Sequence, residues 1–129
     1  MYDRYRDKAD FYLIYIREAH PTDSRRPAPH VKIAQPKTLQ ERWGVAQKFC
    51  THFKLSIPTL VDDMNDSCSR AYNAFPDRLF ILSKDGTIAY RGGRGPRGFK
   101  IDEMEKALQK ILSAASGRGS SSEKRKEKN

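Results

Sequence analysis

Hydrophobic positions in the first half of the chain form one continuous run and then a helical repeat. Phe11–Ile16 contains aromatic and β-branched residues without a polar break, which is typical of a strand buried on both faces. Residues 21–36 contain four prolines and no periodicity, so they predict a loop. Thr38 and Glu41 form a capping box at the start of a helix. The expected apolar face of this helix is Leu39, Trp43, Ala46, Cys50 and Phe53.

The elements predicted after this helix are shorter. Ile57–Val61 predicts a second strand, and Asp66 can cap a brief helix that runs to Ala74. Arg78–Leu82 and Thr87–Arg91 predict an antiparallel hairpin, because the Asp-Gly pair between them is a strong turn signal.

A glycine-rich loop at residues 92–98 leads to a final helix that Asp102 can cap. The expected core positions of that helix are Met104, Leu108, Ile111, Leu112 and Ala115. The element order is therefore β-α-β-α-β-β-α. This order resembles the C-terminal part of a thioredoxin-like α/β domain of the peroxiredoxin-like branch, a mixed sheet with flanking helices.

The resemblance implies that the first βα unit of that fold, whose strand would lie between Phe11–Ile16 and the hairpin, is missing from this chain. Residues 1–10 then correspond to the end of the helix of that unit. Pro76 corresponds to the cis-proline that precedes the hairpin in such folds, and the alternative is an ordinary trans proline at a strand start.

Charge and composition limit the classes of function. The net charge is +9, and it is concentrated in residues 91–100, with four basic residues and no acid, and in residues 117–129. Residues 1–116 are expected to form the domain, and 117–129 a disordered basic tail because they lack apolar side chains. No aromatic residues are interleaved with the charges of the tail, so we expect no nucleic-acid partner.

Other classes are disfavoured by what the sequence lacks. No apolar run approaches the roughly 18 residues of a membrane helix, and the N-terminus is charged throughout, so a cytoplasmic protein without a membrane partner is expected. Cys50 and Cys68 have no metal-ligand spacing, so we expect no metal site.

Four segments resemble the iodothyronine deiodinase family, namely "DFYLIYIREAHPTDS", "LVDDMNDSCSRAY", "PDRLFIL" and "GTIAYRGGRGPRGF". They lie in the family's order between Asp10 and Leu112. The resemblance implies a selenoenzyme, an oxidoreductase of thyroxine 5'-deiodinase type that reductively removes iodine from an iodinated or otherwise halogenated phenol. It implies a selenocysteine or cysteine nucleophile on the missing unit, an external thiol reductant and no bound cofactor.

Carried over by position, the family's motif assigns roles to four residues. His20 would donate or relay the proton, Glu18 would orient His20, and Tyr15 would support this pair. Arg78 would bind the acidic end of the substrate. Chemistry alone agrees in part, because histidine exchanges its proton near neutral pH and a neighbouring carboxylate favours the imidazolium.

Each of these residues can also have an ordinary structural role. His20 would then be a loop residue, Glu18 a solvated carboxylate, Tyr15 a core residue and Arg78 an exposed strand residue. The chain also departs from the family pattern, with Pro36 where a substrate-binding histidine is expected and Ile57 where a regenerating cysteine is expected.

Two other functions remain open at this stage. The first is a complete thioredoxin-like redox protein of other substrate that uses Cys68. The second is a non-catalytic module that binds partners through its basic loop and tail. The resemblance to the deiodinase family also implies that the chain forms a homodimer.

Overall fold

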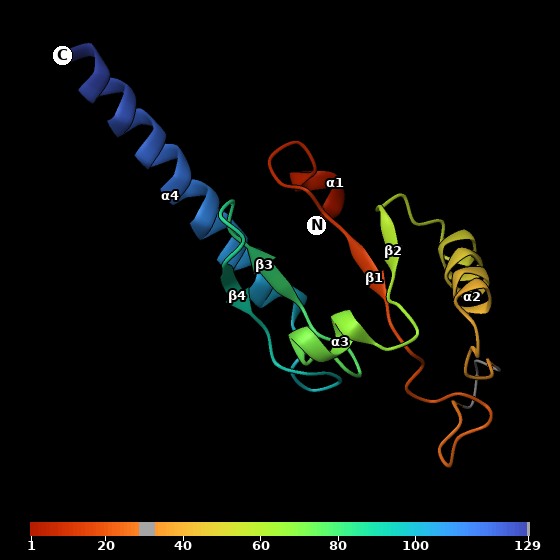
Figure 1. Cartoon of the computed structure of the whole chain (residues 1–129). Helices are drawn as coiled ribbons and strands as arrows, with labels where there is room; N and C mark the ends of the chain where they lie inside the picture. Colours follow the sequence, from red (N-terminus) through yellow and green to blue (C-terminus); the bar gives the residue numbers. More distant parts are fainter. Residues whose placement is uncertain (29–32, 129) are drawn as a thin grey trace.

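The computed structural model describes the backbone of residues 1–28 and 33–128, and the side chains of these residues up to position 115. Strands and helices follow the predicted order, after a single helical turn at the N-terminus (Figure 1). The elements are α1 (Tyr2–Tyr5), β1 (Leu13–Tyr15), α2 (Leu39–His52), β2 (Thr59–Val61), α3 (Ser67–Tyr72), β3 (Phe80–Leu82), β4 (Ile88–Arg91) and α4 (Ile101–Lys128).

The strands form two small sheets with helices beside them. β1 and β2 are parallel, with Ile14 opposite Leu60, whereas β3 and β4 are antiparallel. Among the described residues, no strand pairing joins β1 to β3, so the expected single mixed sheet is present as two pairs. Figure 1 shows α2 next to β2 and α4 next to β3, in agreement with their contacts.

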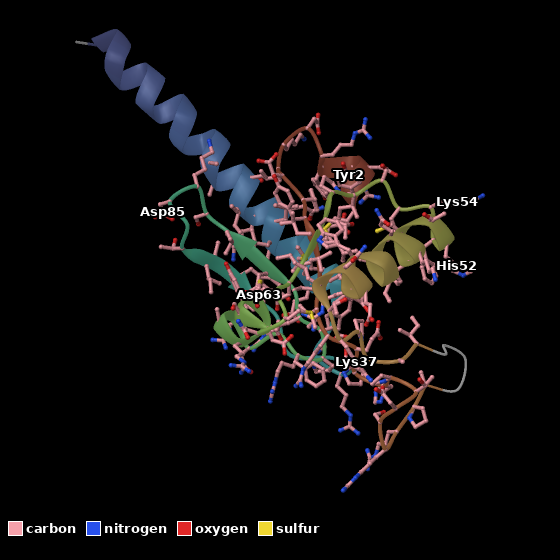
Figure 2. All side chains as sticks on the ribbon, turned by 45° about the vertical axis from the view of Figure 1, so that its right-hand side comes forward. Tyr2, Lys37, His52, Lys54, Asp63 and Asp85 are labelled. Atoms are coloured by element: carbon pink, nitrogen blue, oxygen red, sulfur yellow. The ribbon has the colours of Figure 1, made fainter. Side chains whose placement is uncertain are left out.

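The β3–β4 hairpin confirms the Asp-Gly prediction. Asp85 lies at its tip (Figure 2), where its carboxylate accepts hydrogen bonds from the backbone N–H and the hydroxyl of Thr87, at 3.0 and 2.7 Å. Gly86 follows with a φ of 88°, a left-handed conformation that glycine adopts without a steric penalty. The turn therefore forms from local chemistry alone.

Burial of the β1–β2 pair differs from the prediction. On one face α2 packs against the pair, and Cys50 Sγ lies 3.3 Å from Thr59 Oγ1. On the other face Ile14 and Leu60 remain 39% and 48% exposed. The expectation that β1 is buried on both faces is therefore wrong for the described residues, because a helix covers one face only.

The inward face of α2 also differs from the prediction. Trp43 and Phe53, two expected core residues, are 45% and 58% exposed, whereas Ala46 is buried. Arg42 is buried as well, with only 2% of its surface exposed. The helix is thus rotated so that Arg42 and Ala46, four residues apart, share the inward side.

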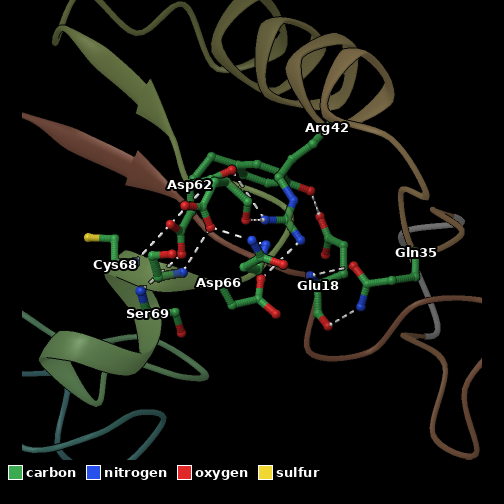
Figure 3. Close-up of polar contacts among 11 residues, drawn as sticks. Glu18, Gln35, Arg42, Asp62, Asp66, Cys68 and Ser69 are labelled. Carbon is green, nitrogen blue, oxygen red and sulfur yellow. Dashed lines mark hydrogen bonds and ion pairs between the residues drawn. The ribbon is translucent and has the colours of Figure 1, made fainter.

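Arg42 ties α2 to the segment that joins β2 to α3 (Figure 3). Its Nη1 donates to the backbone carbonyls of Asp62 and Asp63 at 3.2 and 2.6 Å. Its Nη2 forms an ion pair with Asp66 at 3.1 Å. A guanidinium with several fixed donors suits such a site, because each buried carbonyl needs a partner.

The start of α3 corrects the expected cap. Asp66 lies at the N-cap position, but its side chain makes no capping hydrogen bond and binds Arg42 instead. Asp62, which is 4% exposed, accepts from the backbone N–H groups of Cys68 and Ser69, at 2.9 Å each. Asp62 thus accepts N–H groups at the start of α3, and Asp66 neutralises Arg42.

The N-terminal turn packs on α4. Tyr5 and Leu108 are 6% and 4% exposed, and they are two of the three buried hydrophobic residues among those described. The Tyr5 hydroxyl donates to Glu105 at 3.0 Å and accepts from Gln109 at 2.8 Å. This contact uses the predicted core side of the final helix around Leu108.

The structure continues α4 through residues 117–128, the segment that the composition predicts to be a disordered tail. Its Lys, Arg and Glu residues are good helix formers, and extending an existing helix requires no new nucleation. The composition thus predicts a disordered tail for a segment that is helical in the structure.

Arg42 provides a test of the fold. Replacing it in Arg42→Met leaves two carbonyls and the Asp66 carboxylate without their donor, and we expect the free energy of unfolding to fall by about 3 kcal/mol. Urea unfolding followed by circular dichroism measures this. Arg70→Met is the matched control, because Arg70 is exposed on α3 and should change stability by less than about 0.5 kcal/mol. Equal stability of the two variants would contradict a central role for Arg42.

Candidate functional site

The C-terminal end of β1 carries the first pair of predicted site residues. Tyr15 is the last residue of the strand, and its carbonyl accepts the Asp62 N–H at 2.9 Å, which closes the pairing with β2. The Tyr15 hydroxyl donates to the Glu18 carboxylate three residues later. The structure therefore brings Tyr15 and Glu18 together.

Glu18 is also held through its backbone. The Gln35 side chain accepts from the Glu18 N–H and donates to the Glu18 carbonyl, both at 3.0 Å. The Gln35 N–H in turn donates to the Asp23 carboxylate at 3.0 Å. Figure 3 shows the two hydrogen bonds that join Gln35 to Glu18. Because the Gln35 amide pairs with both backbone groups of Glu18, it fixes the direction of the chain after β1.

His20 lies in the exposed loop beyond Glu18. Its Nδ1 is 2.9 Å from the carbonyl oxygen of Arg26, and its own carbonyl accepts the Ala28 N–H at 3.0 Å. A carbonyl can only accept, so Nδ1 carries the proton of this hydrogen bond. Nε2 is thereby the nitrogen that can release or accept a proton during a reaction.

Glu18 and His20 form no hydrogen bond with each other among the described residues. Tyr15 is the partner of the Glu18 carboxylate, and the Arg26 carbonyl is the partner of the imidazole. The two residues share a loop, but each is oriented by a different neighbour.

Burial dominates the electrostatics of this end of β1. It raises the pKa of Tyr15 well above its ordinary value, and the hydrogen bond to Glu18 raises it further. The positive charge of Arg42 acts in the opposite direction. The Tyr15 phenol is therefore a stable donor to Glu18.

Arg78 is located at the start of the hairpin. Its Nε and Nη1 donate to the carbonyls of Gly92 and Asn73, at 2.6 and 3.1 Å. Desolvation, together with the charges of Arg91 and Arg94, lowers the pKa of Arg78. The backbone therefore holds this guanidinium among other positive charges.

The Phe75–Pro76 peptide bond is cis, the isomer expected for this position. The Arg17 guanidinium carbon lies 4.0 Å from the centre of the Phe75 ring, a cation–π contact. This contact joins the end of β1 to the segment that carries Pro76 and Arg78.

The cysteines offer little nucleophilic chemistry. Cys50 faces Thr59 between α2 and β2. Burial raises the pKa of Cys68, and the charges of Asp62 and Asp63 raise it further, so the thiolate is disfavoured. Across residues 1–28 and 33–128, no cluster of three His, Cys, Asp or Glu could hold a metal ion. Every helix within those residues is too short or too polar to span a lipid bilayer.

Arg42 and Gln35 are the residues that sequence reasoning missed. Arg42 is four residues before Ala46, so helical spacing puts both on one side of α2. The sequence analysis considered only apolar residues for that side. Gln35 lies in the proline-rich loop, and no sequence signal indicates its contact with Glu18.

Comparisons with known proteins agree with the motifs. The family model "Iodothyronine deiodinase" matches residues 1–112. The chain is 38% identical over 108 residues to thyroxine 5-deiodinase of Sparus aurata, which covers 82% of this chain and 39% of that protein. It is 38% identical over 102 residues to type I iodothyronine deiodinase of Xenopus laevis, with 79% and 40% covered. For human thyroxine 5-deiodinase the identity is 35% over 109 residues, with 83% and 35% covered.

The chain thus spans about two fifths of the length of these curated relatives. The family model, in contrast, matches most residues of this chain. The matched residues include the end of β1, the start of α3 and the hairpin with its basic loop. This chain belongs to the iodothyronine deiodinase family.

Proposed function

We propose that this chain forms the proton-handling and substrate-binding part of a reductive deiodination site. The nucleophile, selenocysteine or cysteine, would be carried by a first βα unit of a thioredoxin-like fold that lies outside this chain. The observation that carries the proposal is the arrangement of β1: its far edge has no partner strand among the described residues, and the Tyr15–Glu18 pair lies at its C-terminal end. A strand paired to that edge would place its own C-terminal residue beside Glu18 and His20 if it ran parallel to β1.

The reaction would proceed in two balanced steps. A selenolate attacks iodine, the carbon–iodine bond breaks, and the ring carbon keeps the electron pair and takes a proton. The products are a selenenyl iodide and the deiodinated phenol. Two thiols of an external reductant then become a disulfide, which restores the selenol and releases iodide and a proton.

The chain's own residues would serve the proton transfer and the binding of substrate. His20 would supply the proton from Nε2, because Nδ1 is held by the Arg26 carbonyl. Glu18, oriented by Tyr15 and Gln35, would supply negative charge near the imidazole. Arg78 would attract the acidic end of the substrate. No bound cofactor is required in this scheme.

The redox alternative based on Cys68 has less support. Its thiol has a raised pKa next to two carboxylates, whereas reactive thiols occur beside positive charge.

We also propose that the chain is cytoplasmic and that it forms a homodimer. The exposed Ile14 and Leu60 side chains on the open face of the β1–β2 pair are compatible with further packing there.

The proposal is tested by sequencing the DNA upstream of the Met1 codon and expressing the extended protein. We expect an in-frame TGA or cysteine codon that follows a strand-forming segment, and iodide release from an iodinated phenol with dithiothreitol. His20→Ala should lower kcat/KM about 100-fold. His52→Ala, which alters an exposed histidine at the end of α2, is the control and should leave the rate unchanged. Absence of such a segment, or equal rates for both variants, would overturn the proposal.

Tyr15 gives a pH-dependent prediction. Because burial raises its pKa, the folded chain keeps the phenol proton where the unfolded chain loses it. The resulting stability is complete below the ordinary tyrosine pKa of about 10 and is lost as the pH rises further. We therefore expect the free energy of unfolding to fall between about pH 9 and about pH 11 in the parent chain. The fall should be smaller in Tyr15→Phe, which has no phenol to titrate at this position. Tyr12→Phe, at an exposed position, should follow the parent, and identical profiles for all three chains would contradict the assignment.

A further inference from the structure

Glu18 and Arg78 lie on segments that no strand pairing joins among the described residues. Glu18 follows β1, whereas Arg78 precedes β3, and these strands belong to separate two-stranded sheets. A substrate that contacts both residues needs a fixed distance between the two segments. A side chain that joins the segments would therefore affect substrate binding without touching the substrate.

The segment between α3 and β3 is closed on itself and fixed to the hairpin side. Nη1 of Arg78 donates to the carbonyl of Asn73 at 3.1 Å, and Nε donates to the carbonyl of Gly92 at 2.6 Å. Residues 73–78 therefore form a small loop, and hydrogen bonds determine its position relative to β4. Phe75 lies in the middle of this loop.

Arg17 contacts this loop from the β1 side. Its guanidinium carbon lies 4.0 Å from the centre of the half-buried Phe75 ring, well within the roughly 6 Å limit of a cation–π interaction. Arg17 directly precedes Glu18, and Phe75 is three residues before Arg78. The contact thus joins the two segments next to the two residues that would act on one substrate.

The guanidinium of Arg17 is paired with an aromatic ring and not with a carboxylate. No ion pair of the described residues involves Arg17, and the neighbouring Glu18 carboxylate accepts from Tyr15. A guanidinium is planar and weakly hydrated, so it packs well on an aromatic face, whereas a lysine ammonium is compact and strongly hydrated. The contact therefore depends on arginine itself and not only on a positive charge.

We propose that Arg17 is a positioning residue, which packs on Phe75 and thereby fixes the distance between the Glu18 end of β1 and the loop that carries Arg78. The effect on a substrate rests on the proposed function, whereas the contact itself does not. Loss of the contact should weaken the binding of a substrate that extends from one segment to the other. It should leave the proton transfer at His20 unchanged, because Arg17 acts through Phe75 alone.

The contact can be measured on the chain as it stands. An aromatic ring shifts the NMR signals of protons above its face upfield. In isotope-labelled protein, we expect the side-chain protons of Arg17 upfield of those of Arg70, an exposed arginine on α3. Phe75→Leu should remove this difference, and Phe75→Tyr should keep it. If Phe75→Leu does not fold, the parent chain decides, because Arg17 signals at the Arg70 position would contradict the contact.

The effect on substrate binding is measured on the extended protein with its nucleophile. For 3-(4-hydroxy-3-iodophenyl)propanoate, R17Q and R17K should each raise KM about threefold and leave kcat unchanged, since an exposed cation–π contact corresponds to about that factor. For 2-iodophenol, which is too short to extend between the segments, KM should stay constant. Phe75→Tyr should behave as the parent does. R70Q is the matched control, because it removes the same charge from α3 and should change neither constant.

The remaining outcomes separate the contact from other causes. An unchanged KM in R17Q, or the same rise for both phenols, would overturn the positioning role. A rise in R17Q without one in R17K would indicate a simple charge effect and overturn it as well. R17Q/F75L should raise KM no more than either single variant, because both changes remove one contact, and a multiplied effect would contradict the coupling.

The proposed function can fail without the positioning role. If the extended protein releases no iodide, the proposed function is overturned, and the dissociation constants of the two phenols replace KM. They should show the same pattern across R17Q, R17K and R70Q. Equal dissociation constants in the parent chain and R17Q would then overturn the positioning role too.

Discussion

The buried guanidinium of Arg42 is the interaction on which the rest of the described structure depends. It joins α2 to the end of β2 through two carbonyls and to the start of α3 through Asp66. Its charge also reaches Tyr15 at the end of β1. Few hydrophobic residues are buried among those whose side chains are described, so packing alone only weakly defines the arrangement of these elements. A fixed fork of charged hydrogen bonds supplies the direction that a small core does not.

Sequence patterns predicted the order of elements because each strand and helix has a local cause. The Asp-Gly turn, the capping box before α2 and the apolar repeat of α4 act within a few residues. Burial was less predictable, since it depends on which other elements arrive. Phe11–Ile16 has the composition of a two-sided strand, yet Ile14 lies on an open face. Local propensity determines that a strand forms, and tertiary partners determine what covers it.

The same division applies to the candidate site. The motif identified Tyr15, Glu18, His20 and Arg78, and the structure gives each of them a hydrogen-bond partner. Apart from the Tyr15–Glu18 pair, those partners could not be predicted, because they are backbone carbonyls or a side chain in an aperiodic loop. At the start of α3 the sequence predicted Asp66 as the cap, but Asp66 binds Arg42 and Asp62 accepts the helix N–H groups instead. Sequence therefore predicts the chemical groups better than their pairing.

Acidic and basic side chains are concentrated in two different segments of the chain. Carboxylates gather at the start of α3, where backbone N–H groups and Arg42 satisfy them, and their negative potential disfavours a thiolate at Cys68. The arginines of the loop after β4 are exposed and form no ion pair among the described residues. Charges with fixed hydrogen-bond partners orient the elements that carry them, whereas charges without such partners do not. This difference, more than the number of charges, separates the acidic turn from the basic loop.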